Sequence, residues 1–71
     1  MEPMNFADYL NATRSAYRPG DFLFACVASG EDWTRAQKGL QSMVETIINS
    51  DGEWTEKVEL IHKLANLSWF K

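Results

Sequence analysis

Two residues in this chain have side chains suited to nucleophilic or proton-transfer chemistry, and each type occurs once: Cys26 and His62. A nucleophilic cysteine needs a nearby cation or a helix N-terminus that stabilises its thiolate. Cys26 lies instead between Ala25 and Val27 in an apolar segment, which is typical of a buried structural cysteine. We therefore expect Cys26 to be a core residue.

His62 has Glu59 three residues before it and Asn66 four residues after it. Residues at these spacings share one face of a helix. Acid–base catalysis needs a second group held beside the imidazole in a cleft, and no serine or aspartate is identifiable from the sequence as that group. The sequence therefore favours a histidine that faces solvent or lies at the boundary of the core.

Acidic residues cluster near the start of the last apolar segment, at Asp51, Glu53, Glu56 and Glu59. Asp51-Gly52 resembles part of a calcium loop, but the alternating oxygen ligands and terminal glutamate of an EF-hand are absent. One cysteine and one histidine also fall short of a four-ligand zinc site. We expect no metal and no cofactor. The acids favour the start of a helix, and the alternative is an acidic patch that docks a basic partner.

Large aromatic residues are more numerous than a core of this size can fully hide: Phe22, Phe24, Trp33, Trp54, Trp69 and Phe70. Trp69 and Phe70 stand within the last three residues, and consecutive helical residues point about 100° apart, so both are not expected to face one core. We therefore predict a partner-binding surface that includes Trp69 or Phe70 with Trp33, Glu53 and Glu56, since aromatics dominate interface hot spots. Simple docking of the C-terminus on the core is the alternative.

The balance of charge argues against nucleic acid as the main partner. The formal net charge is −3, and the basic residues are scattered along the chain with acids between them. Nucleic-acid-binding proteins usually concentrate lysine and arginine on one face. A local basic patch of Arg14, Arg18 and Arg35 is the remaining candidate for phosphate contacts.

Nothing in the sequence predicts export or membrane insertion. The first residues lack the basic and apolar regions of a signal peptide. The longest apolar run, from Phe22 to Ala28, is far shorter than the roughly 20 residues that span a bilayer. A soluble cytoplasmic protein is the expectation, in keeping with a single cysteine.

The elements that must position these residues are helices. Asn5 is a good N-cap for a helix over 6–16, which Arg18, Pro19 and Gly20 would end. Asp21 can start a second helix over 22–29, with Gly30 after its end. Because that segment is apolar on nearly every side, we expect it in the middle of a bundle. A buried strand is the alternative for the same residues.

Two further helices complete the prediction. Thr34 to Gln37 matches a capping box for a third helix over 35–49, inside which Gly39 would allow a close helix crossing. Ser50 to Glu53 matches a second capping box, with Thr55 as the alternative cap. The last helix would carry the apolar residues Trp54, Val58, Ile61, Leu64, Ala65, Leu67 and Trp69. The expected fold is a single all-α domain over residues 1–71, a compact four- or five-helix bundle.

Several landmarks occur in an order found in a known family: Phe6, Tyr9-Leu10, Arg14, Gly20-Asp21-Phe22, Asp32-Trp33, Trp69 and Phe70. In this order the chain resembles the small bacterial YozE-like proteins, a helical family with a sterile-alpha-motif-like (SAM-like) fold. It departs from them at Thr34, where the family usually has proline, and at Met43-Val44, where it has a Tyr-Leu pair. The resemblance implies a compact helical bundle without enzymatic activity, and no functional residue is carried over from it.

Together these observations predict a small non-enzymatic interaction module that docks a protein partner or self-associates through an aromatic helical face. Small size and acidity also suit a phage or mobile-element inhibitor of a host machine. The alternative is a DNA-binding or regulatory module whose third helix enters a groove, with Arg35 and Lys38 as its basic residues. A third class is an enzyme subunit or toxin–antitoxin partner whose catalytic residues lie on another chain.

Overall fold

The computed structural model describes residues 3–29 and 36–69, with side chains described as far as Leu67. Within these residues the chain forms four α-helices, a short 3-10 helix and no strand. In chain order they are α1 (Phe6–Ala12), η1 (Arg14–Ala16), α2 (Phe22–Ala28), α3 (Lys38–Ile48) and α4 (Trp54–Trp69). The all-α fold is confirmed, and the strand alternative for the second segment is wrong.

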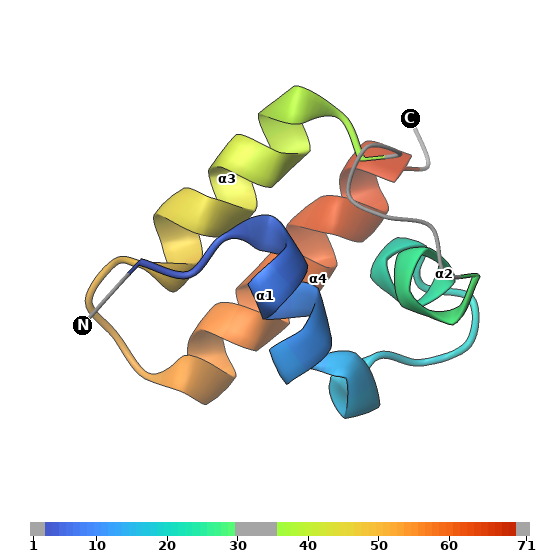
Figure 1. Ribbon diagram of the computed structural model, residues 1–71, viewed down its shortest axis with the longest axis horizontal. Helices are drawn as coiled ribbons and strands as arrows, with labels where there is room; N and C mark the ends of the chain where they lie inside the picture. The colour runs from blue at the N-terminus through green and yellow to red at the C-terminus, as the bar shows by residue number, and fades with distance from the viewer. Residues whose placement is uncertain (1–2, 30–35, 70–71) are drawn as a thin grey trace.

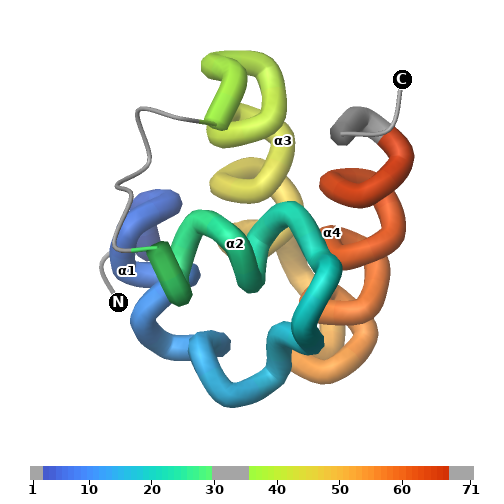
Figure 2. Tube along the Cα trace, turned by 90° about the vertical axis from the view of Figure 1, so that its right-hand side faces the viewer, coloured from blue at the N-terminus to red at the C-terminus, as the bar shows by residue number. Residues whose placement is uncertain are grey.

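The helices form a closed ring around one core. α3 and α4 lie side by side and run in opposite directions (Figure 1). α1 packs against α3 and α2, and α2 packs against α4, which closes the ring (Figure 2). The Cα atoms extend over 29 × 23 × 20 Å. Each helix therefore needs only one apolar face, which its neighbours in the ring cover.

The core draws on all four helices and on the segments between them. Its buried apolar side chains are Phe6, Tyr9, Leu10, Tyr17, Phe22, Leu23, Cys26, Ala36, Leu40, Val44, Ile48, Val58, Ile61 and Ala65. Cys26 is buried, as predicted. The expectation that α2 lies in the middle of the bundle is wrong, because Ala25 and Ala28 are exposed. Only one side of this helix faces its neighbours, and the opposite side carries small alanine side chains.

Asn5 caps α1 as predicted. Its side-chain oxygen accepts a hydrogen bond from the backbone N–H of Asp8 at 2.8 Å, while its own backbone is extended. The helix ends at Ala12 rather than near Ala16. Thr13 is its C-cap, and both the backbone N–H of Thr13, at 3.0 Å, and its hydroxyl, at 2.6 Å, donate to the carbonyl oxygen of Tyr9. The chain then continues as the 3-10 turn η1.

The third helix begins later than the capping box predicted. Thr34 lies outside the described residues, but Ala36 and Gln37 are described and are not helical. The side-chain amide of Gln41 donates to the carbonyl oxygen of Ala36 at 2.8 Å, which holds the segment before α3 against that helix. Gln37 is extended and makes no side-chain cap bond. The predicted start at Arg35 is therefore wrong, and α3 begins at Lys38.

Both predicted caps of the last helix are also wrong. The hydroxyl of Ser50 donates to the carbonyl oxygen of Ile47 at 2.6 Å, so it closes the end of α3 instead of starting α4. Gly52 has a φ of 139°, which turns the chain at this point. α4 then begins at Trp54, one residue before Thr55.

Gly39 does not mark a close helix crossing. It is exposed, and a Cβ atom built on it would meet no atom within 4 Å. Among the helices of the described residues, none has the length and hydropathy needed to cross a bilayer.

Candidate functional site

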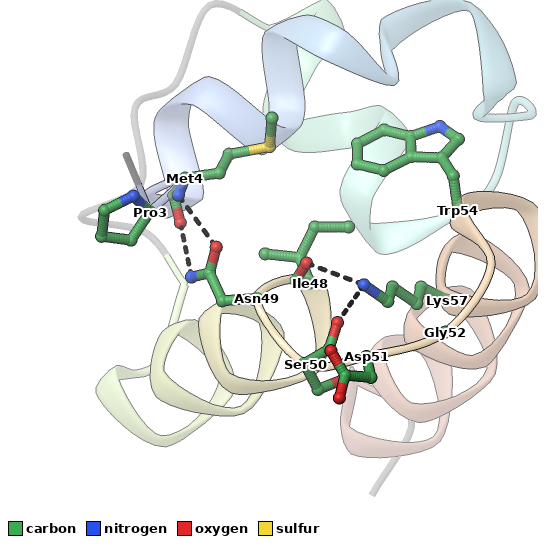
Figure 3. Close-up of a pocket in the computed structure, with 9 residues that line it drawn as sticks. All are labelled: Pro3, Met4, Ile48, Asn49, Ser50, Asp51, Gly52, Trp54 and Lys57. Atoms are coloured by element: carbon green, nitrogen blue, oxygen red, sulfur yellow. Dashed lines mark hydrogen bonds between the residues drawn. The ribbon is translucent and has the colours of Figure 1, made fainter. Parts of the chain in front are cut away.

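A groove lies where the N-terminal segment meets the turn between α3 and α4. We name it the Trp54 groove, and its lining residues are Pro3, Met4, Ile48, Asn49, Ser50, Asp51, Gly52, Trp54 and Lys57. Its volume of about 560 Å³ is within the range of ligand-binding clefts. Figure 3 shows the side chains of Met4 and Trp54 on two sides of Ile48. The groove therefore combines an apolar interior with polar residues of the turn.

Trp54 is the principal apolar residue of this groove. Its ring is tilted at 55° to that of Tyr9, with 6.2 Å between the ring centroids. Tyr9 is fully buried, whereas Trp54 remains 45% exposed. One part of the indole thus rests on the core, and another part faces solvent.

Two sets of hydrogen bonds fix the groove walls (Figure 3). The side-chain oxygen of Asn49 accepts from the backbone N–H of Met4 at 2.9 Å, and its amide nitrogen donates to the Met4 carbonyl at 3.1 Å. On the other side, the ammonium of Lys57 donates to the carbonyl oxygens of Ile48, at 3.2 Å, and of Ser50. These contacts join the N-terminal segment and α4 to the C-terminal end of α3.

One acidic side chain lines the Trp54 groove. Asp51 is exposed there, whereas Glu53, just before α4, and Glu56, in its first turn, are exposed but are not among the lining residues. The Lys57 ammonium is engaged by two carbonyl oxygens, which also stabilise its positive charge at the C-terminal end of α3. The groove lining therefore holds one carboxylate, of Asp51, and one ammonium, of Lys57, and the acidic patch stays a prediction.

A second cleft lies beside the start of α2 and contains His62. Its lining residues are Ala16, Arg18, Asp21, Thr55, Val58, Glu59, His62, Lys63 and Asn66. Glu59, His62 and Asn66 share this cleft, as their spacing predicted. Acids of the predicted cluster are thus divided between two places, because Glu59 faces this cleft and Asp51 faces the Trp54 groove.

Asp21 is the polar centre of the second cleft. One carboxylate oxygen accepts from the backbone N–H of Arg18 at 3.1 Å and lies 3.9 Å from Nδ1 of His62. The other accepts from the side-chain amide of Asn66 at 3.3 Å. Asp21 occupies the N-cap position of α2 but does not cap it. Instead, the side-chain oxygen of Asn66 accepts from the backbone N–H of Phe22 at 3.0 Å.

The sequence missed the pairing of Asp21 with His62, which joins residues 41 positions apart in the chain. The imidazole also packs on Tyr17, with 4.6 Å between the ring centroids. Burial lowers the pKa of His62 from its usual 6.5, the nearby Asp21 carboxylate opposes this effect, and Arg18 adds to it. His62 is 20% exposed, as expected for a boundary residue.

The two ring nitrogens of His62 have different surroundings. Its Nε2 atom is buried and has no hydrogen-bond partner among the described residues. Its Nδ1 atom faces the Asp21 carboxylate at 3.9 Å. Within the described ranges, no group of three or more potential metal-ligating side chains lies close enough to hold an ion.

The residues predicted to bind a partner fall into three groups. Glu53 and Glu56 are described and exposed, and neither is among the residues that line the Trp54 groove. Trp33 and Phe70 lie outside the described residues. Trp69 is the last residue of α4, and its side chain is not described. The aromatic surface that these residues were predicted to form stays a prediction.

Arg14 and Arg18 are exposed on η1 and on the turn after it, and Arg35 lies outside the described residues. In both overall views, η1 and the first turn of α3 lie at opposite ends of the molecule (Figures 1 and 2). Lys38 is the first residue of α3, and Arg14 is the first residue of η1. The basic residues in the described ranges do not line α3 as a groove-entering helix requires.

Sequence reasoning also missed exposed apolar residues on α4. Trp54 and Leu67 were predicted among the apolar residues of the last helix, and they are 45% and 65% exposed, while Leu60 is 46% exposed. A signal for the leucines was present, since at about 100° per residue both fall on the side opposite Ile61 and Ala65. The sequence gives no comparable signal for the exposure of Trp54, because this residue falls on the same side of the helix as the buried Ile61 and Ala65.

Comparisons with known proteins give no further guide. No family model matches the chain, and no curated protein or solved structure matches it. The resemblance to the YozE-like family and its SAM-like topology therefore stay predictions, and function must be inferred from the geometry of this chain.

Proposed function

We propose that this chain is a non-enzymatic interaction module that holds a short segment of a partner protein in the Trp54 groove. The observation that carries this proposal is the placement of Trp54, which packs on buried Tyr9 and is still 45% exposed. Tryptophan is enriched among the few residues that carry most of the energy of an interface. A half-exposed indole beside an apolar floor supports a docking role.

The groove walls support the proposal because they are joined before binding. Asn49 holds Met4 through two hydrogen bonds, and Lys57 holds the carbonyls at the end of α3. Ordering of loops and side chains on association costs affinity, so walls that are already fixed favour binding. A partner segment would have only its own chain to order.

The charge around the groove indicates the chemistry of the partner. Asp51 is exposed and lines the groove together with Met4, Ile48 and Trp54, and the exposed Glu53 directly precedes Trp54 in the chain. A segment with an apolar side chain next to lysine or arginine complements both features. Complementary charge raises the rate of encounter and fixes the orientation of the bound segment.

A finer form of the proposal is an inhibitor from a phage or mobile element. An acidic module of this size could cover a basic surface of a host machine that normally binds nucleic acid, with the Trp54 groove holding one apolar side chain of that surface. A cytoplasmic location belongs to the same proposal, in keeping with the single buried cysteine.

Selection from a displayed peptide library tests this proposal. We expect enriched peptides to pair a large apolar residue with lysine or arginine, and to lose binding to the Trp54→Ala variant. Leu67→Ala is the matched control, because it removes an apolar side chain of even greater exposure outside the groove. Peptides that bind Trp54→Ala as well as wild type would contradict the proposal.

Trp54→Ala also removes the contact with Tyr9, so a second variant is needed that leaves the core intact. The double charge reversal Asp51→Lys with Glu53→Lys changes only exposed positions. This double variant should bind the selected peptides more weakly, while its thermal unfolding midpoint stays near the wild-type value. Steeply salt-dependent binding of duplex DNA by the wild-type protein would instead support the nucleic-acid alternative.

A further inference from the structure

The turn between α3 and α4 contains the dipeptide Asp51-Gly52, whose residue types suit an intramolecular ring closure. The backbone nitrogen of a residue that follows aspartate can attack the Cγ atom of that aspartate and close a five-membered succinimide ring. Glycine hinders this attack least, because it has no Cβ atom. Asp51 and Gly52 are both exposed and lie outside the helices. The turn therefore has the residue types and the exposure that ring closure requires.

Hydrogen bonding separates this pair from the other aspartates and asparagines. A backbone N–H that donates a hydrogen bond must first break that bond before its nitrogen can attack. In the described parts of the chain, every other aspartate or asparagine precedes a residue whose N–H donates a hydrogen bond or lies inside a helix: Asn5, Asp8, Asn11, Asp21, Asn49 and Asn66. Within residues 3–29 and 36–69, by contrast, the N–H of Gly52 and the carboxylate of Asp51 make no hydrogen bond. Neither reacting group is therefore held away from the other by a contact of its own.

We propose that Asp51 is a site of spontaneous covalent modification, at which the turn between α3 and α4 converts to an isoaspartyl form. First, the Gly52 nitrogen bonds to Cγ of the protonated Asp51 side chain, the Cγ–OH bond breaks, and the nitrogen's proton leaves with that hydroxyl as water. Water then adds to either carbonyl of the ring, and the bond from that carbonyl carbon to nitrogen breaks. Opening at Cγ restores aspartate, whereas opening at the main-chain carbonyl leaves Gly52 joined to Asp51 through Cγ. The mass is unchanged, and the reaction needs no reagent other than water.

Isomerisation changes the geometry of the turn and keeps its charge. It adds one methylene, a bond of about 1.5 Å, to the main chain at Asp51. The residue before it is held, because the carbonyl oxygen of Ser50 accepts a hydrogen bond from the ammonium of Lys57. The residue after it packs on the same side chain, since a Cβ atom built on Gly52 would lie 3.5 Å from Cε of Lys57. A longer main chain between these two points displaces at least one of them, so we expect the isomerised protein to be less stable.

Peptide mapping of protein aged at physiological temperature and pH tests the proposal. The tryptic peptide over 39–57 contains Asp51 as its only aspartate, and its isoaspartyl form elutes separately with an unchanged mass. Deamidation of Asn49 in the same peptide would raise the mass, which distinguishes the two reactions. We expect isoaspartate to accumulate in the folded protein at a rate within about tenfold of that in the synthetic peptide, because an exposed turn opens at little cost in free energy. A folded protein that keeps Asp51 intact while the free peptide isomerises would refute the proposal.

Asp51→Glu is the matched control, because it keeps the carboxylate but would have to close a six-membered ring, which forms more slowly. Asp51→Asn should form the same succinimide faster than wild type, with loss of ammonia, since an amide needs no prior protonation. The thermal unfolding midpoint of the isomerised fraction should fall by on the order of several degrees, and aged Asp51→Glu should keep the midpoint of the fresh variant. An isomerised fraction that unfolds at the temperature of fresh protein would overturn the proposed change in the turn. None of these measurements depends on a ligand of the Trp54 groove.

Discussion

The carboxylate of Glu45 accepts a hydrogen bond from the backbone N–H of Phe6 at 2.8 Å, across 39 residues of chain. The first N–H groups of a helix have no hydrogen-bond acceptor within that helix. Here a side chain of α3 supplies an acceptor for the first N–H group of α1. Asn66 of α4 does the same for Phe22 of α2. Side chains of the α3–α4 pair thus position the ends of the two short helices.

Replacement of Glu45 by alanine should lower the free energy of unfolding by about 1–2 kcal/mol, because it removes a charged acceptor from a partly buried N–H group. Urea denaturation measures this change. Glu45→Gln keeps a hydrogen-bond acceptor at the same position and should lose less stability than Glu45→Ala. Glu56→Ala is the matched control on an exposed helical site, and its effect should be within about 0.5 kcal/mol. Equal effects of Glu45→Ala and Glu56→Ala would contradict a role for this bond.

The helices were predictable from the sequence because their signals are local. Asn5 accepts a hydrogen bond from a backbone N–H only three residues later in the chain. Leu40, Val44 and Ile48 show the spacing of one buried helix face. The predicted boundaries at Thr34 and Ser50 failed for a related reason. A capping box is worth only about 1 kcal/mol, and tertiary contacts can outweigh it. At Ser50, the hydroxyl instead serves the end of the preceding helix.

The candidate site was less predictable, because it depends on contacts between distant segments. The Trp54 groove exists because Asn49 holds Met4, 45 residues away in the chain. Trp54 has the helical position of a core residue, and only its location at the first residue of α4 leaves it at the edge of the bundle. The pairing of Asp21 with His62 likewise joins two helices whose packing has no local sequence signal.

Two glycines should respond to alanine in opposite directions. Gly39 lies in the first turn of α3 with open space around it, so Gly39→Ala should raise the free energy of unfolding by roughly 0.5–1 kcal/mol. Gly52 has a φ of 139°, which an alanine adopts only with strain. Gly52→Ala should therefore lower the free energy of unfolding by about 1 kcal/mol or more. Thermal and urea unfolding of both variants provide the measurement. A stabilising Gly52→Ala would show that the turn before α4 can adopt another conformation.

The hydroxyl of Thr13 should stabilise the folded protein through its polar contacts with Tyr9 and Tyr17 in the core. It lies 2.6 Å from the carbonyl oxygen of Tyr9 and 2.5 Å from the hydroxyl of Tyr17, and both tyrosine side chains are buried. Thr13→Val keeps the shape but removes a hydrogen-bond partner of Tyr17, at a cost of about 1–2 kcal/mol in stability. Thr13→Ser keeps the hydroxyl and is the matched control. A Thr13→Val variant that keeps the wild-type urea midpoint would contradict a stabilising role for the hydroxyl.

His62 should make stability depend on pH below neutrality. Burial lowers its pKa in the folded protein below the usual 6.5, an effect that Arg18 reinforces and Asp21 opposes. The unfolded chain therefore binds more protons than the folded protein between the lowered pKa and 6.5, so stability rises with pH across that window and levels off above it. His62→Gln cannot take up this proton. Its stability should fall less than that of wild type when the pH is lowered.

Urea unfolding of wild type and His62→Gln at about pH 7.5 and about pH 5.5 separates this effect from other titrations. Carboxylates titrate in both proteins, so they largely cancel in the difference between the two pH dependences. The wild-type protein should lose more stability than the variant across this interval. A wild-type protein that gains stability relative to His62→Gln on acidification would mean that the attraction between Asp21 and the imidazolium outweighs the cost of burying its charge.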